Sequence, residues 1–225
     1  MSLERWSIGD GPGPHSPDGF AVEITRRVEP AGVPELLHAA LSPSATVLEL
    51  GAGTGRISDA LAALGHPTTA LDHSADMLAL VKRAEPVLAD MRDCDLRRTF
   101  DAVVLATFLI NVPDLDMRTD FLRACRRHVS PSGQVFIQRQ VPDRFDQVKP
   151  SVDQWYDGGR RETVNAHLDG DLLTVSEAFT VGGQKWNHTF VVRRIADAEL
   201  PDVLAEAGLR LDRWLSSQWL VARPA

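Results

Sequence analysis

The chain has 225 residues, of which 44% are hydrophobic, and this length is sufficient for one domain with a full hydrophobic core. Its formal net charge of −7 disfavours binding to nucleic acid and to anionic membranes, because such binders usually carry a basic surplus. The sequence shows no signal-peptide pattern and no apolar run of about 18 residues, and its two cysteines indicate reduced thiols. We therefore expect a soluble, cytoplasmic protein without nucleic-acid or membrane partners.

The N-terminal region, residues 1–45, is predicted to cap the main domain. Residues 9–19 are rich in Gly and Pro, so regular structure is not expected there. Trp6 and Phe20 flank this segment, which is therefore either a flexible tail or a lid with an apolar anchor at each end. Two short helices are predicted after it, over residues 20–28 and 33–41.

From residue 46 onward, short apolar runs typical of buried parallel strands alternate with segments of helical periodicity. The predicted strands are residues 46–50, 68–71, 87–89, 102–106 and 134–139. The predicted helices are residues 55–64, 74–81 and 114–129, with Ser74 as the N-cap of the second. This alternation predicts an α/β fold with a doubly wound, mostly parallel, seven-stranded Rossmann-like sheet and helices on both faces.

The alternation stops after residue 139. Strand-like runs joined by Gly-containing turns follow at residues 160–168, 172–181 and 185–194. They predict an antiparallel meander, at about 160–194, inserted into a domain that spans residues 46–225. A last helix near 197–207 and strands over 209–215 and 218–222 are expected to complete the main sheet.

A glycine loop follows the first strand of this domain, where residues 47–56 read VLELGAGTGR. A strand, a glycine turn and a helix in this order present backbone N–H groups to a ligand. A dinucleotide fingerprint has Gly or Ala at its sixth position, but Arg56 stands there. Glu49 would repel a pyrophosphate and can bind an ammonium group, whereas Asp72 ends the second strand, where an acid can bind a ribose diol. A ligand with a ribose and an amino group but no phosphate fits these features, and S-adenosylmethionine is such a ligand.

Residues 46–139 resemble the class I S-adenosylmethionine-dependent methyltransferases, whose first motif is similar to ELGAGTG. The resemblance implies a methyltransferase that uses S-adenosylmethionine and leaves S-adenosylhomocysteine. It implies that Glu49 lies near the methionine moiety, that Asp72 binds the ribose, and that Asp90 and Met91 contact the adenine. The candidate cofactor-binding residues are Glu49, Gly51, Ala52, Gly53, Gly55, Asp72, His73, Met77, Asp90, Met91 and Thr107.

The candidate catalytic residues are His188 and His15, as general bases for an acceptor that needs one. A histidine on an apolar face is commonly a core residue instead, and both interpretations stay open. The sequence contains no HExxH or CxxC motif and no persuasive acidic cluster, so we expect metal-free catalysis. Segment 107–111 lacks the Asn/Asp-Pro-Pro-aromatic motif of enzymes that methylate base or glutamine amides, which disfavours an amide acceptor.

The expected partner is a small-molecule methyl acceptor that the sequence does not identify, and a homodimer is left open. Two other functions share part of the pattern, namely a non-catalytic S-adenosylmethionine-binding protein and an NAD-dependent oxidoreductase.

The third meander run carries an apolar face of Trp186, His188, Phe190 and Val192. We hypothesise that this face roofs the acceptor pocket and that the N-terminal segment closes the pocket from the other side. The alternative is that the face packs on a helix or on another subunit.

Overall fold

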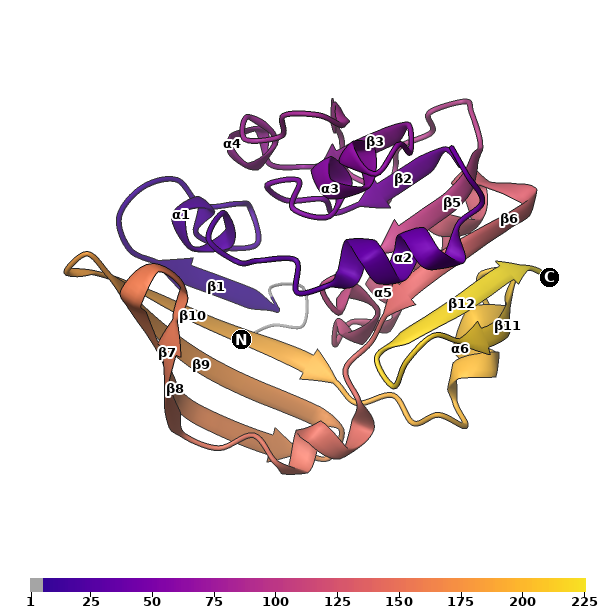
Figure 1. Ribbon diagram of the computed structural model, residues 1–225. Helices are drawn as coiled ribbons and strands as arrows, with labels where there is room; N and C mark the ends of the chain where they lie inside the picture. Colours follow the sequence, from indigo (N-terminus) through magenta and orange to yellow (C-terminus); the bar gives the residue numbers. More distant parts are fainter. Residues whose placement is uncertain (1–5) are drawn as a thin grey trace.

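Two β-sheets form the framework of the protein in the computed structural model, which describes residues 6–225. The first has seven strands in the order β11-β12-β6-β5-β2-β3-β4, and the second has five in the order β1-β10-β9-β8-β7. Figure 1 shows the five-stranded sheet at the lower left and the seven-stranded sheet at the upper right, with helix α1 between them. The protein is therefore built in two parts that face each other.

The seven-stranded sheet is mostly parallel. Its parallel strands are β2 (Val47–Leu50), β3 (Thr68–Asp72), β4 (Glu85–Leu88), β5 (Phe100–Leu105) and β6 (Val129–Gln138). Strand β12 (Trp219–Pro224) pairs antiparallel with β6, and β11 (Leu209–Trp214) pairs antiparallel with β12. Strands β2 and β3 are buried along their whole length, which explains why their sequences are apolar runs without alternation. The predicted seven-stranded Rossmann-like sheet is confirmed.

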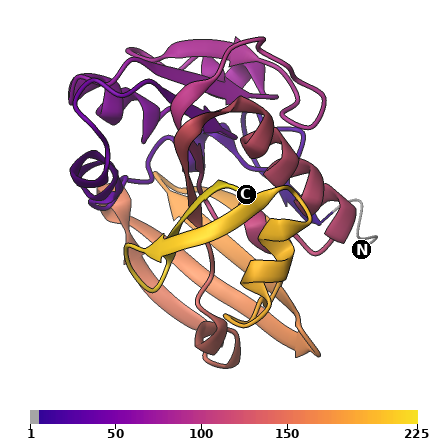
Figure 2. The ribbon, with the colours of Figure 1, turned by 90° about the vertical axis from the view of Figure 1, so that its right-hand side faces the viewer.

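Helices cover both faces of this sheet. They are α2 (Val33–Ala40), α3 (Ser58–Ala63), α4 (Ala75–Leu78), α5 (Leu115–His128) and α6 (Leu200–Ala205), whereas Ile24 of α1 (Val22–Thr25) packs against residues of the five-stranded sheet. Helices α2 and α3 pack on one face through Leu37 and Leu61, whereas α5 and α6 pack on the other through Leu122 and Leu204 (Figure 2). Ser74 accepts a hydrogen bond from the Met77 amide at 3.4 Å, so the predicted cap of α4 is confirmed.

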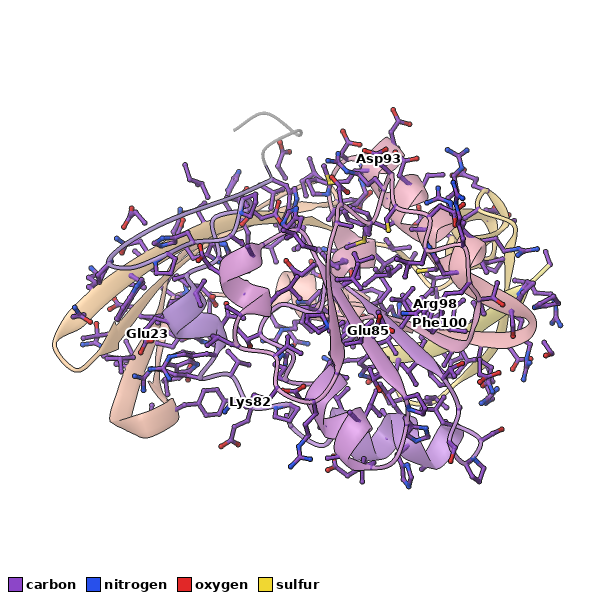
Figure 3. All side chains as sticks on the ribbon, turned by 90° about the horizontal axis from the view of Figure 1, so that it is seen from above. Glu23, Lys82, Glu85, Asp93, Arg98 and Phe100 are labelled. Atoms are coloured by element: carbon purple, nitrogen blue, oxygen red, sulfur yellow. The ribbon has the colours of Figure 1, made fainter. Side chains whose placement is uncertain are left out.

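At the outer edge of the sheet, strand β4 is held by charged side chains. Arg98 forms an ion pair with Glu85 at 2.5 Å, and its guanidinium lies 5.1 Å from the centre of the Phe100 ring. Figure 3 shows these three residues close together and remote from Glu23 of α1.

The five-stranded sheet is entirely antiparallel and contains more than the predicted meander. The three predicted runs form β8 (Gly159–Asp169), β9 (Leu172–Val181) and β10 (Gln184–Arg193), and β7 (Ser151–Trp155) precedes them. Strand β1 (Ser7–Asp10) pairs with β10, with Ser7 opposite Phe190. The expectation that residues 9 and 10 lack regular structure was therefore wrong, because a distant strand supplies their hydrogen bonds. The predicted cap region 1–45 is described only from residue 6, and residues 1–5 lie outside the described part.

Phe136 is wholly buried in the apolar cluster between the seven-stranded sheet and α2. We expect Phe136→Ala to lower the free energy of unfolding by about 3–5 kcal/mol, because it removes buried contacts and leaves a cavity. Val152→Ala, at a side chain 56% exposed, should change it by less than about 0.5 kcal/mol. Urea unfolding of both variants measures the difference, and equal losses would contradict this account of the core.

Candidate functional site

A cavity of about 550 Å³ lies between the two sheets. One wall consists of the loops that follow β2, β3, β4 and β5, and the other is the inner face of the five-stranded sheet. In doubly wound sheets, ligands bind at the carboxyl ends of the strands, and small-molecule sites commonly have volumes of roughly 300–1,000 Å³. The position and the size of the cavity both suit a small-molecule site.

The glycine loop forms the floor of this cavity through Gly51, Ala52 and Gly53, whereas Gly55 lies outside the lining. Gly51 has a φ of +71°, and a Cβ atom there would lie 2.8 Å from Leu109 Cδ1. The amides of Gly51 and Ala52 both donate to the carbonyl of Leu71, at 2.9 and 3.0 Å. The loop is thus held against the end of β3, and its first glycine is needed for both conformation and space.

Asp72, at the end of β3, is 7% exposed and lines the cavity. Its Oδ2 accepts a hydrogen bond from the Gly53 amide at 2.7 Å, and its Oδ1 accepts one from the Ser74 amide at 2.8 Å. Each carboxylate oxygen keeps a second lone pair for a ligand. Asp72 therefore fixes the glycine loop and also offers acceptors to the cavity.

Glu49 lies away from the cavity wall. It is 2% exposed, and its carboxylate accepts a hydrogen bond from the hydroxyl of Ser58, the first residue of α3. Burial raises the pKa of Glu49 to about 7, although the Ser58 hydrogen bond acts in the opposite direction. The side chain thus joins β2 to α3, and Glu49 is not among the described residues that line the cavity.

The other predicted cofactor-binding residues, His73, Met77, Asp90, Met91 and Thr107, all line the cavity. Asp90 forms an ion pair with Arg92 at 2.6 Å, which holds the pKa of Asp90 below its usual value. His73 Nε2 lies 3.0 Å from Asp18 Oδ2, and this contact raises the pKa of His73. The structure brings these candidates together on one wall.

Thr107 and Phe108 both adopt left-handed backbone conformations, with φ of +55° and +61°. Such conformations are costly for residues other than glycine and persist where the surroundings impose them. Here the Thr107 amide donates to Gln138 Oε1 at 2.9 Å, and Arg56 donates to the Thr107 hydroxyl at 3.2 Å. The loop after β5 is therefore held in a strained shape at the cavity.

The apolar face of β10 forms part of the opposite wall, and its residues Trp186, His188, Phe190 and Val192 all line the cavity. His188 Nε2 lies 2.7 Å from Ser7 Oγ of β1. Burial lowers the pKa of His188 to about 4, so its ring is neutral near pH 7. The second catalytic candidate, His15, lies outside the lining of the cavity, and its Nδ1 is 3.1 Å from the Gly13 carbonyl oxygen.

Several polar residues of the cavity wall were not predicted from the sequence, among them Arg144, Arg161, Thr163 and Glu177. Glu177 is the most informative, because it interrupts the alternating apolar positions 173, 175 and 179 of β9. The signal available in the sequence was a carboxylate at an inward position, on the otherwise apolar face of this strand.

Within residues 6–225, no helix is long and apolar enough to cross a membrane. In the same part of the chain, no three His, Cys, Asp or Glu side chains are grouped so that they could hold a metal ion.

Residues 48–137 match the family model described as a methyltransferase domain. The chain is 31% identical over 157 residues to the cypemycin N-terminal methyltransferase of Streptomyces sp, covering 66% of this chain and 60% of that protein. It is 30% identical over 146 residues to the ubiquinone biosynthesis O-methyltransferase of Xanthomonas axonopodis pv. citri (strain 306), covering 59% and 55% of the two chains. The chain therefore spans less than two thirds of the length of either relative.

The fold is similar to that of the sugar N-methyltransferase KedS8 from Streptoalloteichus sp ATCC 53650, with a TM-score of 0.75. The similarity covers 97% of this chain and 98% of the other, at 20% sequence identity. It extends over both sheets, so the five-stranded sheet belongs to the shared architecture.

The buried position of Glu49 predicts a pH dependence of stability. Because its pKa in the folded state lies above the usual value of 4.5, the folded state retains a proton that the unfolded state has lost between pH 4.5 and 7. The contribution of Glu49 to the free energy of unfolding should therefore fall as the pH rises through this window, by up to about 3 kcal/mol. Glu49→Gln should remove this fall, and Glu35→Gln, on the exposed side of α2, should retain it. Urea unfolding at pH 5 and pH 8 provides the test, and parallel profiles for Glu49→Gln and the parent would refute it.

Proposed function

We propose that the chain is a class I S-adenosylmethionine-dependent methyltransferase, which transfers a methyl group from S-adenosylmethionine to a small-molecule acceptor. This family and fold are those predicted from the sequence. The observation that carries the proposal is a single cavity that joins the glycine loop and Asp72 to the inner face of the five-stranded sheet. The loop side is suited to the cofactor, and the sheet side is suited to the acceptor.

The residues of the loop side fit S-adenosylmethionine in chemistry and in position. Asp72 would bind the ribose hydroxyls through its remaining lone pairs, and Asp90 with Met91 would contact the adenine. Arg56, a cation on the same wall, would pair with the methionine carboxylate. Glu49 would act indirectly, by holding β2 and α3 in the positions that shape the loop. When bound, S-adenosylmethionine supplies an electrophilic methyl group and becomes S-adenosylhomocysteine.

The chain's own contribution to the reaction is alignment in a pocket with little water. Trp186, Phe190 and Val192 give the acceptor side an apolar surface. His188 is held by Ser7 and is neutral, and its lowered pKa makes it a weaker base than an exposed histidine. These side chains therefore serve mainly to position the acceptor near the methyl group.

The lid hypothesis is supported by the contacts of the N-terminal segment. Asp18 and Phe20 line the cavity, and the Phe20 ring lies 4.3 Å from the His188 ring. β1 ties this segment to β10, and the ion pair between Asp18 and His73 ties it to the loop after β3. We propose that the segment covers the cavity and excludes water while the reaction proceeds. The homodimer and the absence of nucleic-acid partners stay predictions.

The names of the similar proteins indicate methyl acceptors of two kinds. Two are N-methyltransferases by name, acting on an N-terminus and on a sugar, and one is an O-methyltransferase. We therefore propose an amine nitrogen or a hydroxyl oxygen as the acceptor atom.

Calorimetry tests the cofactor assignment. Asp72→Ala should weaken S-adenosylhomocysteine binding at least about 100-fold, because two charge-assisted hydrogen bonds to the ribose are each worth roughly 1.5–3 kcal/mol. Asp72→Asn should lose less, since its amide oxygen can still accept the Gly53 hydrogen bond. Asp76→Asn, at an exposed position in the next helix, is the matched control and should bind like the parent. Parent-like affinity in both Asp72 variants would show that the ribose lies elsewhere.

The catalytic proposal is tested by incubating the protein with S-adenosylmethionine and acceptor mixtures of amines, phenols and carboxylic acids. Mass spectrometry should detect S-adenosylhomocysteine together with a methylated acceptor. Binding of S-adenosylmethionine without product from any mixture would favour the non-catalytic binding protein. Tight NAD binding with no response to S-adenosylmethionine would favour the oxidoreductase.

A further inference from the structure

Building on the proposed function, we infer that Glu177 selects the acceptor, and that the acceptor is a small molecule with a basic amine. Three features support it: the place of Glu177 in the five-stranded sheet, its lack of a close hydrogen-bond partner, and the charges around it.

Glu177 lies in the middle of a polar row that crosses the inner face of the sheet. It is directly opposite His188 on β10 and directly opposite Thr163 on β8. Directly paired residues of antiparallel strands point to the same face, and all three line the cavity. On β9 and β10 the neighbouring pairs are apolar, with Phe179 and Trp186 on one side and Val175 and Phe190 on the other, and Arg161 of β8 lies opposite Phe179. Glu177 is thus the one carboxylate among the inward-facing residues of β9, and its neighbours on that face of the strand are apolar.

The Glu177 carboxylate has unused hydrogen-bonding capacity. Its nearest cation is Arg161, whose Nε lies 3.9 Å from Glu177 Oε1, which is too long for a hydrogen bond. Arg161 is shared with Asp153 on β7, to which its Nη2 lies at 3.5 Å. Among the described residues, none donates a hydrogen bond to this carboxylate. A half-buried carboxylate without a donor is costly, and a ligand that supplies N–H groups removes that cost.

The charges that face Glu177 are Arg161 on β8, Arg144 in the turn Pro142–Asp146, and Asp153 on β7, with neutral His188 beside it on β10. The two arginines favour its ionised form, but burial outweighs them and raises the pKa of Glu177. A carboxyl group with a raised pKa is a stronger base than an exposed one, so it is better suited to accept a proton from an ammonium group.

These properties match the requirements of N-methylation. The acceptor enters as an ammonium ion and pairs with the Glu177 carboxylate, to which it gives one proton. The freed lone pair forms the new N–C bond while the S–CH₃ bond breaks, and the electron pair of that bond stays on sulfur. The product is a methylammonium ion, and the proton on Glu177 returns to water when the product leaves. A hydroxyl acceptor would not gain the ion pair.

The test compares Glu177→Gln and Glu177→Asp with the parent, and uses Glu162→Gln as the control. Glu162 lies on β8 between Arg161 and Thr163, hence on the opposite face, and it pairs with Arg160 outside the cavity. The probes are three amine–alcohol pairs: 2-phenylethylamine with 2-phenylethanol, glucosamine with glucose, and alanyl-phenylalanine amide with its lactyl analogue. Binding is measured by calorimetry in the presence of S-adenosylhomocysteine, and methyl transfer is measured by mass spectrometry.

We expect the parent to bind and methylate the amine of at least one pair at least tenfold better than its alcohol. Glu177→Gln should lose at least tenfold in both measurements, Glu177→Asp should recover part of this loss, and Glu162→Gln should match the parent. All four proteins should bind S-adenosylhomocysteine alike, which separates this inference from the cofactor assignment. An alcohol preferred to its amine, no preference in any pair, or full amine binding by Glu177→Gln would overturn the inference. Failure of the parent to bind S-adenosylhomocysteine would instead overturn the proposed function.

Discussion

The hydrogen bond from the Gly53 amide to the Asp72 carboxylate is the interaction on which the site depends. It joins the loop after β2 to the end of β3, and the same carboxylate also positions the start of α4 through Ser74. Because parallel strands end at the same edge of a sheet, one side chain can connect two successive strand–helix units there. The loop shape, the entry of α4 and the acceptors offered to the cavity are thus set by one residue.

The seven-stranded sheet could be predicted from the sequence because its signals are local. Apolar runs such as residues 47–50, the glycine turn and the Ser74 cap each act within a few residues, and each indicates the same fold. Strands β1 and β7 could not be predicted in this way. β1 exists because β10, some 180 residues away in the chain, pairs with it, and a Gly/Pro-rich sequence gives no sign of that partner.

The residues of the candidate site also differ in whether local sequence signals or packing in the folded chain set their positions. Gly51, Asp72 and Asp90 were predicted as cofactor-binding residues, and all three line the cavity, because their positions at strand ends follow from the order of strands. Glu49 shows the limit, since its place at the end of β2 was correct but its side chain turns toward Ser58 instead of the cavity. The direction of a side chain depends on packing against α3, which periodicity does not contain.

The two walls of the cavity also differ in how they are built. The loop wall consists of short turns between successive elements, and backbone hydrogen bonds to Leu71 and Asp72 fix the shape of its glycine loop. The sheet wall consists of alternate residues of β8, β9 and β10, and a substitution at an inward position changes the acceptor side without disturbing a turn. Under the proposed function, residues such as Glu177 can therefore vary with the acceptor while Asp72 and the glycine loop keep their role toward the cofactor. This separation explains why the sequence motifs identify the methyl donor, whereas the acceptor has to be inferred from side chains that only the folded sheet brings together.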